Sequence, residues 1–261
     1  MVIRTKETPK LPEINVPRVL HKLISEIKAT VSACKKGKVL LAVSGGTDTS
    51  VLADLCCRAL GSDSVYGLQM THSCDTELQT KDGAILARHL RIRMRKMEIT
   101  PPVELLAEML RVPFHGEEAQ LRRYQIIDRL RMMIMLDVAE QEGMHHLSAL
   151  NLTEQLLGLG VVCGTFAPVA QPLSQLYKTY IFELADYLGL PEQIRIRQPS
   201  FELWRCPIEG SEPREVIREI DKVLYLRTER NFTPSKIKRA GFAPRFVSSI
   251  LKRLSEAHAT Q

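Results

Sequence analysis

Residues 44–50 read Ser-Gly-Gly-Thr-Asp-Thr-Ser and lie between two apolar runs of the sequence. The run before them, 39–43, is typical of a buried strand, and the segment after them is typical of a helix that continues to Leu60 and ends at Gly61. A strand that passes through a glycine pair into a helix gathers backbone N–H groups at the helix N-terminus, where anions bind. The spacing matches neither G-x-x-x-x-G-K-[ST] nor G-x-G-x-x-G. This turn therefore predicts an anion site in an α/β fold.

Strands and helices alternate through the first 150 residues. Strands are expected at 39–43, 64–70, 93–99 and 144–150, and helices at 17–35, from after Asp48 to 60, at 77–90 and at 117–142. Pro101 and Pro102 are expected to interrupt the pattern. The alternation predicts a doubly wound parallel sheet with helices on both faces. One domain over 1–261 is expected, with residues 1–16 flexible and 205–261 forming a small helical C-terminal extension.

Three segments follow predicted strands and should meet at one edge of this sheet. They are the Ser44 turn, residues 70–75, and Leu150 with Asn151. Parallel sheets bind ligands at the carboxyl ends of their strands, near a switch in strand order. We therefore expect the active site at this edge.

Composition excludes several classes of protein. The sequence has 261 residues, 44% of them hydrophobic, but no apolar run of 18 or more, and residues 1–10 are polar. The six cysteines form no C-x-x-C pair, which favours reduced thiols in a cytoplasmic protein without structural zinc. The net charge of +6 is dispersed and is not interleaved with aromatic residues. A surface that attracts nucleotide phosphates is thus favoured over a nucleic-acid groove, and no membrane partner is expected.

Longer motifs point to one family. The 44–50 string resembles the S-G-G-x-D-[ST] loop of the ATP pyrophosphatase superfamily, which has the adenine nucleotide alpha hydrolase-like fold. Residues 129–132, 147–158, 172–190 and 199–204 read RLRM, LSALNLTEQLLG, PLSQLYKTYIFELADYLGL and PSFELW. In this order they resemble the ammonia-dependent NAD synthetase family, over about residues 20–225.

The resemblance implies an activity and its requirements. ATP and Mg²⁺ would be the cofactors, and a small-molecule carboxylate or carbonyl would be the substrate. The carboxylate would attack the α-phosphorus of ATP, releasing pyrophosphate, and ammonia or another small nucleophile would then displace AMP. The family also implies a homodimer whose interface helps to build the acceptor site.

The resemblance also assigns roles to individual residues. Asp48, Arg131 and Lys178 are the expected catalytic residues, and Asp48 and Glu154 are the expected Mg²⁺ ligands. On residue type alone, Asp48 could instead be a carboxylate at a helix start, and Lys178 a solvated helix residue. ATP binding is assigned to a larger set of residues: Ser44, Gly45, Gly46, Asp48, Thr49, Arg131, Lys178 and Ser200.

The sequence departs from the family mainly where the acceptor would bind. Residues 125–128 replace an Asn-x-x-Ala run, and Ala149 replaces a phosphate-facing Thr. Residues 159–165 are small and aliphatic, with Thr165 in place of an Asp, and 258–261 lack a His-Lys-Arg ending. We therefore expect little synthesis of NAD from deamido-NAD and a smaller or more apolar acceptor.

Three functions remain compatible with these residues. The first is an ATP-dependent amide-forming ligase. The second is a divergent relative that uses the adenylate for sulfur transfer, with Cys74 or Cys163 as carrier, although a buried inert thiol is the commoner state of a cysteine. The third is a catalytically idle nucleotide-binding homodimer, against which the two carboxylates Asp48 and Glu154 argue.

Overall fold

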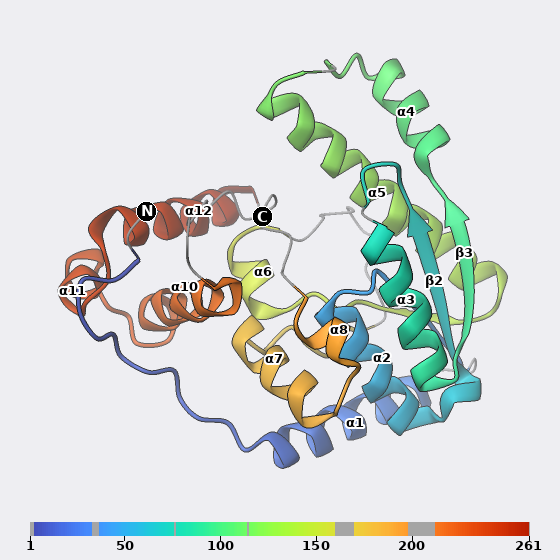
Figure 1. Ribbon diagram of the computed structural model, residues 1–261, viewed down its shortest axis with the longest axis horizontal. Coiled ribbons are helices and arrows are strands. Elements are labelled where there is room, and N and C mark those ends of the chain that lie inside the picture. The colour runs from blue at the N-terminus through green and yellow to red at the C-terminus, as the bar shows by residue number, and fades with distance from the viewer. Residues whose placement is uncertain are drawn as a thin grey trace.

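A computed structural model describes residues 3–32, 37–75, 77–113, 115–159, 170–197 and 212–260. Within these ranges β1 (Val39–Ala42), β2 (Val65–Thr71), β3 (Arg93–Glu98) and β4 (His145–Leu147) form one parallel sheet in the order β3-β2-β1-β4 (Figure 1). The predicted doubly wound sheet is confirmed. Its strand order reverses at β1, which pairs with β2 on one side and β4 on the other. The 44–50 turn therefore leaves the sheet at the switch point, where ligands bind in such folds.

Both faces of the sheet are covered by helices. Leu41 of β1 packs into a core shared with α1 (Val16–Ser32), α2 (Thr47–Leu60) and α3 (Glu77–Leu90). Its neighbour Leu40 packs on the opposite face, into a core shared with α4 (Thr100–Met109) and α5 (Glu117–Gln141). Successive side chains of a strand point to opposite faces, so a strand covered on both sides reads as a continuous apolar run.

The expected interruption at Pro101 and Pro102 is wrong. Both prolines lie in the first turn of α4, which begins at Thr100. Proline lacks a backbone N–H, but the first N–H groups of a helix have no partner within the helix, and the fixed φ of proline suits that position. In Figure 1, α4 and the adjoining end of α5 extend beyond the sheet.

The C-terminal part of the chain is helical, as expected. It includes α10 (Pro213–Thr228), α11 (Pro234–Arg239) and α12 (Pro244–Thr260), which pack around the buried rings of Phe242 and Phe246. The helices that connect it to the sheet are α6 (Leu152–Leu156), α7 (Lys178–Tyr187) and α8 (Glu192–Arg195).

Residues 3–15 contain no helix or long strand, yet they are held against the C-terminal helices. Arg4 forms a β-bridge with Phe242, and the backbone N–H of Thr5 donates to Gly241 O at 2.8 Å. The hydroxyl of Tyr180 donates to Pro12 O at 2.7 Å. Contacts with residues distant in the sequence thus connect this segment to the helices, and its flexibility stays a prediction. No helix in the described ranges is long and apolar enough to cross a membrane.

Candidate active site

The turn after β1 leaves the N-terminus of α2 without a side-chain cap. Gly45 has φ +73°, a left-handed conformation that favours glycine, and Gly46 is the N-cap residue. The Gly46 N–H donates to Ser44 Oγ at 3.2 Å, and the Thr49 hydroxyl lies 3.3 Å from that oxygen. As a glycine, Gly46 makes no side-chain capping bond to the first N–H groups of α2. The turn therefore presents these donors and the positive end of the helix dipole to an anion.

Asp48, in the first turn of α2, is the centre of a polar cluster. Its Oδ2 forms an ion pair with the Nζ of Lys178, and its Oδ1 accepts from Asn151 Nδ2 at 2.9 Å. The side chains of Lys178 and Asp48 are 6% and 16% exposed, so solvent screens the pair weakly. Lys178 is thus buried in the site, which excludes its alternative interpretation as a solvated helix residue.

Glu154 joins this cluster through a capping box at the start of α6. Asn151 Oδ1 accepts from the Glu154 N–H at 2.9 Å, and Glu154 Oε2 accepts from the Asn151 N–H at 3.2 Å. Burial and the charge of Asp48 raise the pKa of Glu154 to about 7, against the opposing effects of Lys178 and the Asn151 N–H. The nearby positive charge is therefore too small to keep the pKa of the Glu154 carboxyl at its ordinary value.

These two carboxylates have the chemistry of a magnesium site. Oxygen ligands suit Mg²⁺, and a divalent cation beside Glu154 and Asp48 would offset the repulsion that raises the Glu154 pKa. In the described ranges, no group of three or more His, Cys, Asp or Glu side chains is arranged to hold a metal ion. Two carboxylates are fewer ligands than Mg²⁺ takes, so an ion held here would also need oxygens of phosphate or water.

Arg131, on α5, lies at the end of β2 and is not in the Asp48 cluster. Its Nη2 contacts both carboxylate oxygens of Asp75 at 3.1 and 3.2 Å, and its Nη1 is 3.8 Å from Asp128. Burial raises the pKa of Asp128, and the charge of Asp75 adds to the shift while Arg131 opposes it. Asp128 also contributes to the raised pKa of Glu154, which links the two groups electrostatically.

A further cation, Arg197, lies beside the 44–50 turn. Nothing in the sequence pointed to a role for this residue. Its Nη1 donates to Ser44 O at 3.3 Å and to Asp82 Oδ2, on α3, at 3.2 Å. Burial raises the pKa of Asp82 and lowers that of Arg197, while their mutual attraction opposes both shifts. The ion pair fixes the turn to α3.

Cys74 lies directly after β2, at the same edge of the sheet. It is exposed, and its Sγ is 3.0 Å from Nδ1 of the buried His72. By contrast, burial raises the pKa of Cys56 and raises that of Cys57 to about 11, which makes both poor nucleophiles. The predicted residues Ser200 and Cys163 lie outside the described residues, as do 160–165.

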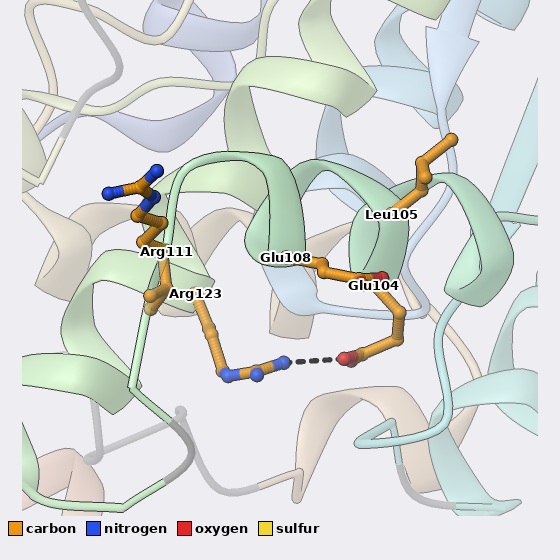
Figure 2. Close-up of a pocket in the computed structure, with 6 residues that line it drawn as sticks. Glu104, Leu105, Glu108, Arg111 and Arg123 are labelled. Carbon is orange, nitrogen blue, oxygen red and sulfur yellow. Dashed lines mark hydrogen bonds and ion pairs between the residues drawn. The ribbon is translucent and has the colours of Figure 1, made fainter.

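A surface pocket of about 580 Å³ lies apart from these predicted residues, on α4, the turn after it and α5 (Figure 2). Arg123 and Glu104, two of the residues that line it, form an ion pair at 2.6 Å between Nη1 and Oε2. The pocket is lined by Glu104, Leu105, Glu108, Arg111, Val112 and Arg123.

Some of these partners could have been found from sequence. Asn151 followed three residues later by Glu154 is a capping-box pattern, which would have marked Asn151 as the first residue before a helix. Asp75, the partner of Arg131, and Asp82, the partner of Arg197, have no local signal, because each pairing joins residues distant in sequence.

Comparisons with known proteins agree on one group. The family model described as NAD synthase matches residues 19–259. An NH(3)-dependent NAD(+) synthetase of Chlorobium phaeobacteroides is 34% identical over 82% of this chain and 76% of its own length. That of Chlorobaculum parvum is 31% identical over 81% and 75%.

Solved structures share the fold. The NH3-dependent NAD synthetase from Campylobacter jejuni, in complex with the nitrate ion, has a TM-score of 0.74 and 22% identity, over 94% of this chain and 96% of that one. The NMN synthetase from Francisella tularensis has a TM-score of 0.69 and 21% identity, over 95% and 94%.

Proposed function

Because this chain belongs to the NAD synthase family, we propose that it activates a carboxylate with ATP and converts it to an amide with ammonia. The observation that carries this proposal is the buried Asp48–Lys178 pair at the uncapped N-terminus of α2. A carboxylate oxygen of the acceptor attacks the α-phosphorus of ATP, and pyrophosphate leaves. Ammonia then attacks the acyl carbon, and AMP leaves with the bonding electrons. Positioning and charge neutralisation supply the catalysis, without a covalent enzyme intermediate.

The 44–50 turn is the proposed site of the ATP phosphates. Ser44, Thr49 and the backbone of Gly45 and Gly46 would supply neutral donors, which an anion needs beside the positive end of α2. Lys178 would turn its ammonium group toward the same oxygens. Arg131 would act from the end of β2 if it exchanged part of its contact with Asp75 for a phosphate oxygen.

Asp48 and Glu154 are the residues we assign to Mg²⁺. When bound, the ion would neutralise phosphate charge that develops as the α–β bond breaks. Asn151 positions both carboxylates, since its amide nitrogen donates to Asp48 and its backbone N–H donates to Glu154. Lys178 meanwhile holds Asp48 in place by their ion pair.

We further propose that the enzyme acts in the cytoplasm as a homodimer. Leu105, Met109 and Leu110 of the α4 region are each more than half exposed, as is Met133 on α5. Exposed large apolar side chains on neighbouring helices are typical of an interface, and a second copy of this chain is the proposed partner. Light scattering of the purified protein and of a Leu105→Lys/Met109→Lys variant tests this: the wild type should have the mass of two chains and the variant that of one.

The proposed reaction is tested by its products. Purified protein is incubated with Mg-ATP, ammonium and a panel of carboxylates that includes deamido-NAD and the acid form of NMN, and nucleotides and amides are identified by mass. Acceptor-dependent AMP, pyrophosphate and an amide are expected. Acceptor-dependent ADP and orthophosphate would contradict the proposal.

Cys74→Ser separates amide formation from sulfur transfer. Cys74 is exposed beside His72, so it is the described cysteine best placed to carry sulfur. An amide-forming ligase should keep its AMP-forming rate in this variant, because a serine hydroxyl fills the same space. Loss of acceptor-dependent turnover in Cys74→Ser, with the fold intact, would favour sulfur transfer.

A further inference from the structure

Asp221, a residue of the C-terminal helix α10, is completely buried and is bonded to two other helices. Its Oδ1 accepts from the Thr153 hydroxyl at 2.7 Å. Its Oδ2 accepts from the Thr179 hydroxyl at 2.6 Å and from the Thr179 backbone N–H at 2.8 Å. Thr153 also accepts from the Lys178 backbone N–H at 2.8 Å. One carboxylate thus joins the first turns of α6 and α7.

Each threonine in this group is the chain neighbour of a proposed site residue. Thr153 precedes Glu154, and Thr179 follows Lys178. Because backbone geometry links neighbouring residues, a shift of either threonine moves the adjacent site residue with it. Asp221 itself makes none of these bonds to Glu154 or Lys178 side chains, so any effect on them is indirect.

Asp221 also replaces a missing helix cap. The N-cap residue of α7 is Tyr177, whose side chain makes no capping bond. An N-cap side chain would normally accept from the second or third N–H of its helix. Here the second N–H of α7, that of Thr179, is bonded instead by a carboxylate from a different helix. The start of α7, and with it Lys178, is therefore held by α10.

We propose that Asp221 is a positioning residue for the proposed ATP-dependent reaction, fixing α6 to α7 so that Glu154 and Lys178 are both held beside Asp48. The proposal rests on the function proposed above. The C-terminal helices would then act on catalysis through this carboxylate, although they contribute no described residue to the Asp48 cluster. Burial raises the pKa of Asp221 to about 6, but the three donors and Lys178 oppose the shift, so the group is largely ionised at neutral pH.

The substitutions that test this keep the shape of the site. Asp221→Asn replaces one acceptor oxygen by an N–H donor, so one threonine hydroxyl loses the acceptor for its proton. Thr153→Val removes the bonds to Asp221 and to the Lys178 N–H without changing the volume much. Thr153→Ser restores the hydroxyl and is the conservative rescue.

Glu219→Gln is the matched control. Glu219 is also a buried carboxylate on α10, but its oxygens accept from Thr8 Oγ1 at 2.9 Å and from Lys222 Nζ at 2.6 Å, away from α6 and α7. It therefore reports what the loss of a buried carboxylate on this helix does to stability alone.

The measurement separates kcat from KM in acceptor-dependent AMP formation, with the unfolding midpoint of every variant recorded. Asp221→Asn and Thr153→Val should each lower kcat at least about tenfold, because a small misplacement of catalytic groups reduces the rate strongly. The KM for the acceptor should change by less than about threefold, since Asp221 is completely buried and its carboxylate oxygens are bonded to Thr153 and Thr179. Thr153→Ser and Glu219→Gln should keep kcat within about threefold of the wild type.

A kcat of Asp221→Asn close to that of the wild type would overturn the proposal, as would an equal loss of kcat in Glu219→Gln. A second readout does not depend on the reaction. Amide hydrogen exchange of the 177–182 segment should accelerate in Asp221→Asn and Thr153→Val but not in Glu219→Gln. If the wild type makes no AMP, the proposed function fails, whereas unchanged exchange would show that Asp221 does not hold α7.

Discussion

Lys178 and Asp48 form a buried ion pair although 130 positions separate them in the sequence. The pair brings α7 against the start of α2 and places a cation beside the turn proposed for ATP phosphates. Neither residue has another partner of opposite charge in the described ranges within salt-bridge distance. Asp48 therefore depends on Lys178 for its neutralisation, while Lys178 also lowers the pKa values of Glu154 and Asp221 by its charge.

Lys178→Met should reduce both activity and stability. Removal of one partner of a buried pair leaves the other charge unpaired, which costs about 3 kcal/mol of unfolding free energy. The loss of one charge at the reacting phosphate should lower kcat about 100-fold or more. Chemical denaturation and AMP formation measure the two effects. Lys22→Met is the control, because the exposed pair of Lys22 with Glu26 should contribute less than about 1 kcal/mol. Wild-type turnover in Lys178→Met would exclude the phosphate role.

Asp48→Asn and Glu154→Gln should each abolish turnover while the fold survives. Each variant loses a proposed Mg²⁺ ligand, which should cost about 3 kcal/mol or more of transition-state stabilisation. Added Mg²⁺ with ATP should raise the melting temperature of the wild type but not of either variant. Thr49→Ser, which keeps the hydroxyl, should be nearly silent. An unchanged rate in Asp48→Asn would remove the metal role.

Glu154→Gln has a separate effect on stability without ligands. The folded-state pKa of Glu154, about 7, lies above its ordinary value of 4.5. Such a group favours folding when protonated, and that contribution is lost as pH rises from 4.5 through 7. The unliganded variant should therefore be at least as stable as the wild type at pH 8. Its unfolding free energy should not show the fall between pH 4.5 and 7 that Glu154 causes in the wild type. A variant clearly less stable at pH 8 would contradict this.

His146 should make the protein sensitive to acid. Its imidazole lies buried in β4, where burial lowers the pKa from 6.5 to about 4. The unfolded chain takes up a proton below pH 6.5 but the folded one does not, so this source of stability, about 3 kcal/mol, disappears between pH 6.5 and 4. In His146→Met, stability relative to the wild type should rise by that amount as pH falls. His21→Met, at an exposed position, is the control for the loss of a histidine outside the core.

Deamido-NAD should be a poor acceptor for this enzyme. The family's aromatic and acidic stretch corresponds to the small, aliphatic residues 159–165, and each lost polar contact costs about 1.5 to 3 kcal/mol. The expected result is weak NAD formation beside faster amidation of a smaller or more apolar carboxylate. A turnover of about 1 per second with a micromolar KM for deamido-NAD would show that NAD synthesis is its ordinary reaction.

The sequence predicted the α/β order well because the governing signals are local. Each signal is contained in a short stretch of sequence: the apolar run at 39–43, the glycine after Leu60 and the periodicity of 77–90. The observed bounds of these elements differ from the expected ones by few residues. β4 is shorter than expected, since only His145–Leu147 pair with β1 before the chain turns toward Asn151.

The site was predictable only in part, because its pairings join distant elements. Asp48, Glu154 and Lys178 do gather beside one another, but their roles remain predictions. Arg131 bonds Asp75, and Asp221 bonds Thr153 and Thr179, through contacts that no periodicity or spacing encodes. The misplaced break at Pro101 has a local cause: proline ends a helix in its interior but suits its first turn.

The bridge between Arg4 and Phe242 also bears on the order in which parts of the chain fold during synthesis. Residues 3–15 are translated before the groups that bind them, which include Tyr180 and, more than 200 positions later in the sequence, Gly241. The sheet and its helices can thus form while this segment is still unattached. Its attachment closes a loop of nearly the whole chain, at an entropic cost that grows only slowly with length. In a newly synthesised molecule, Arg4 and Thr5 can therefore reach their final positions only after residues 241 and 242 have been translated.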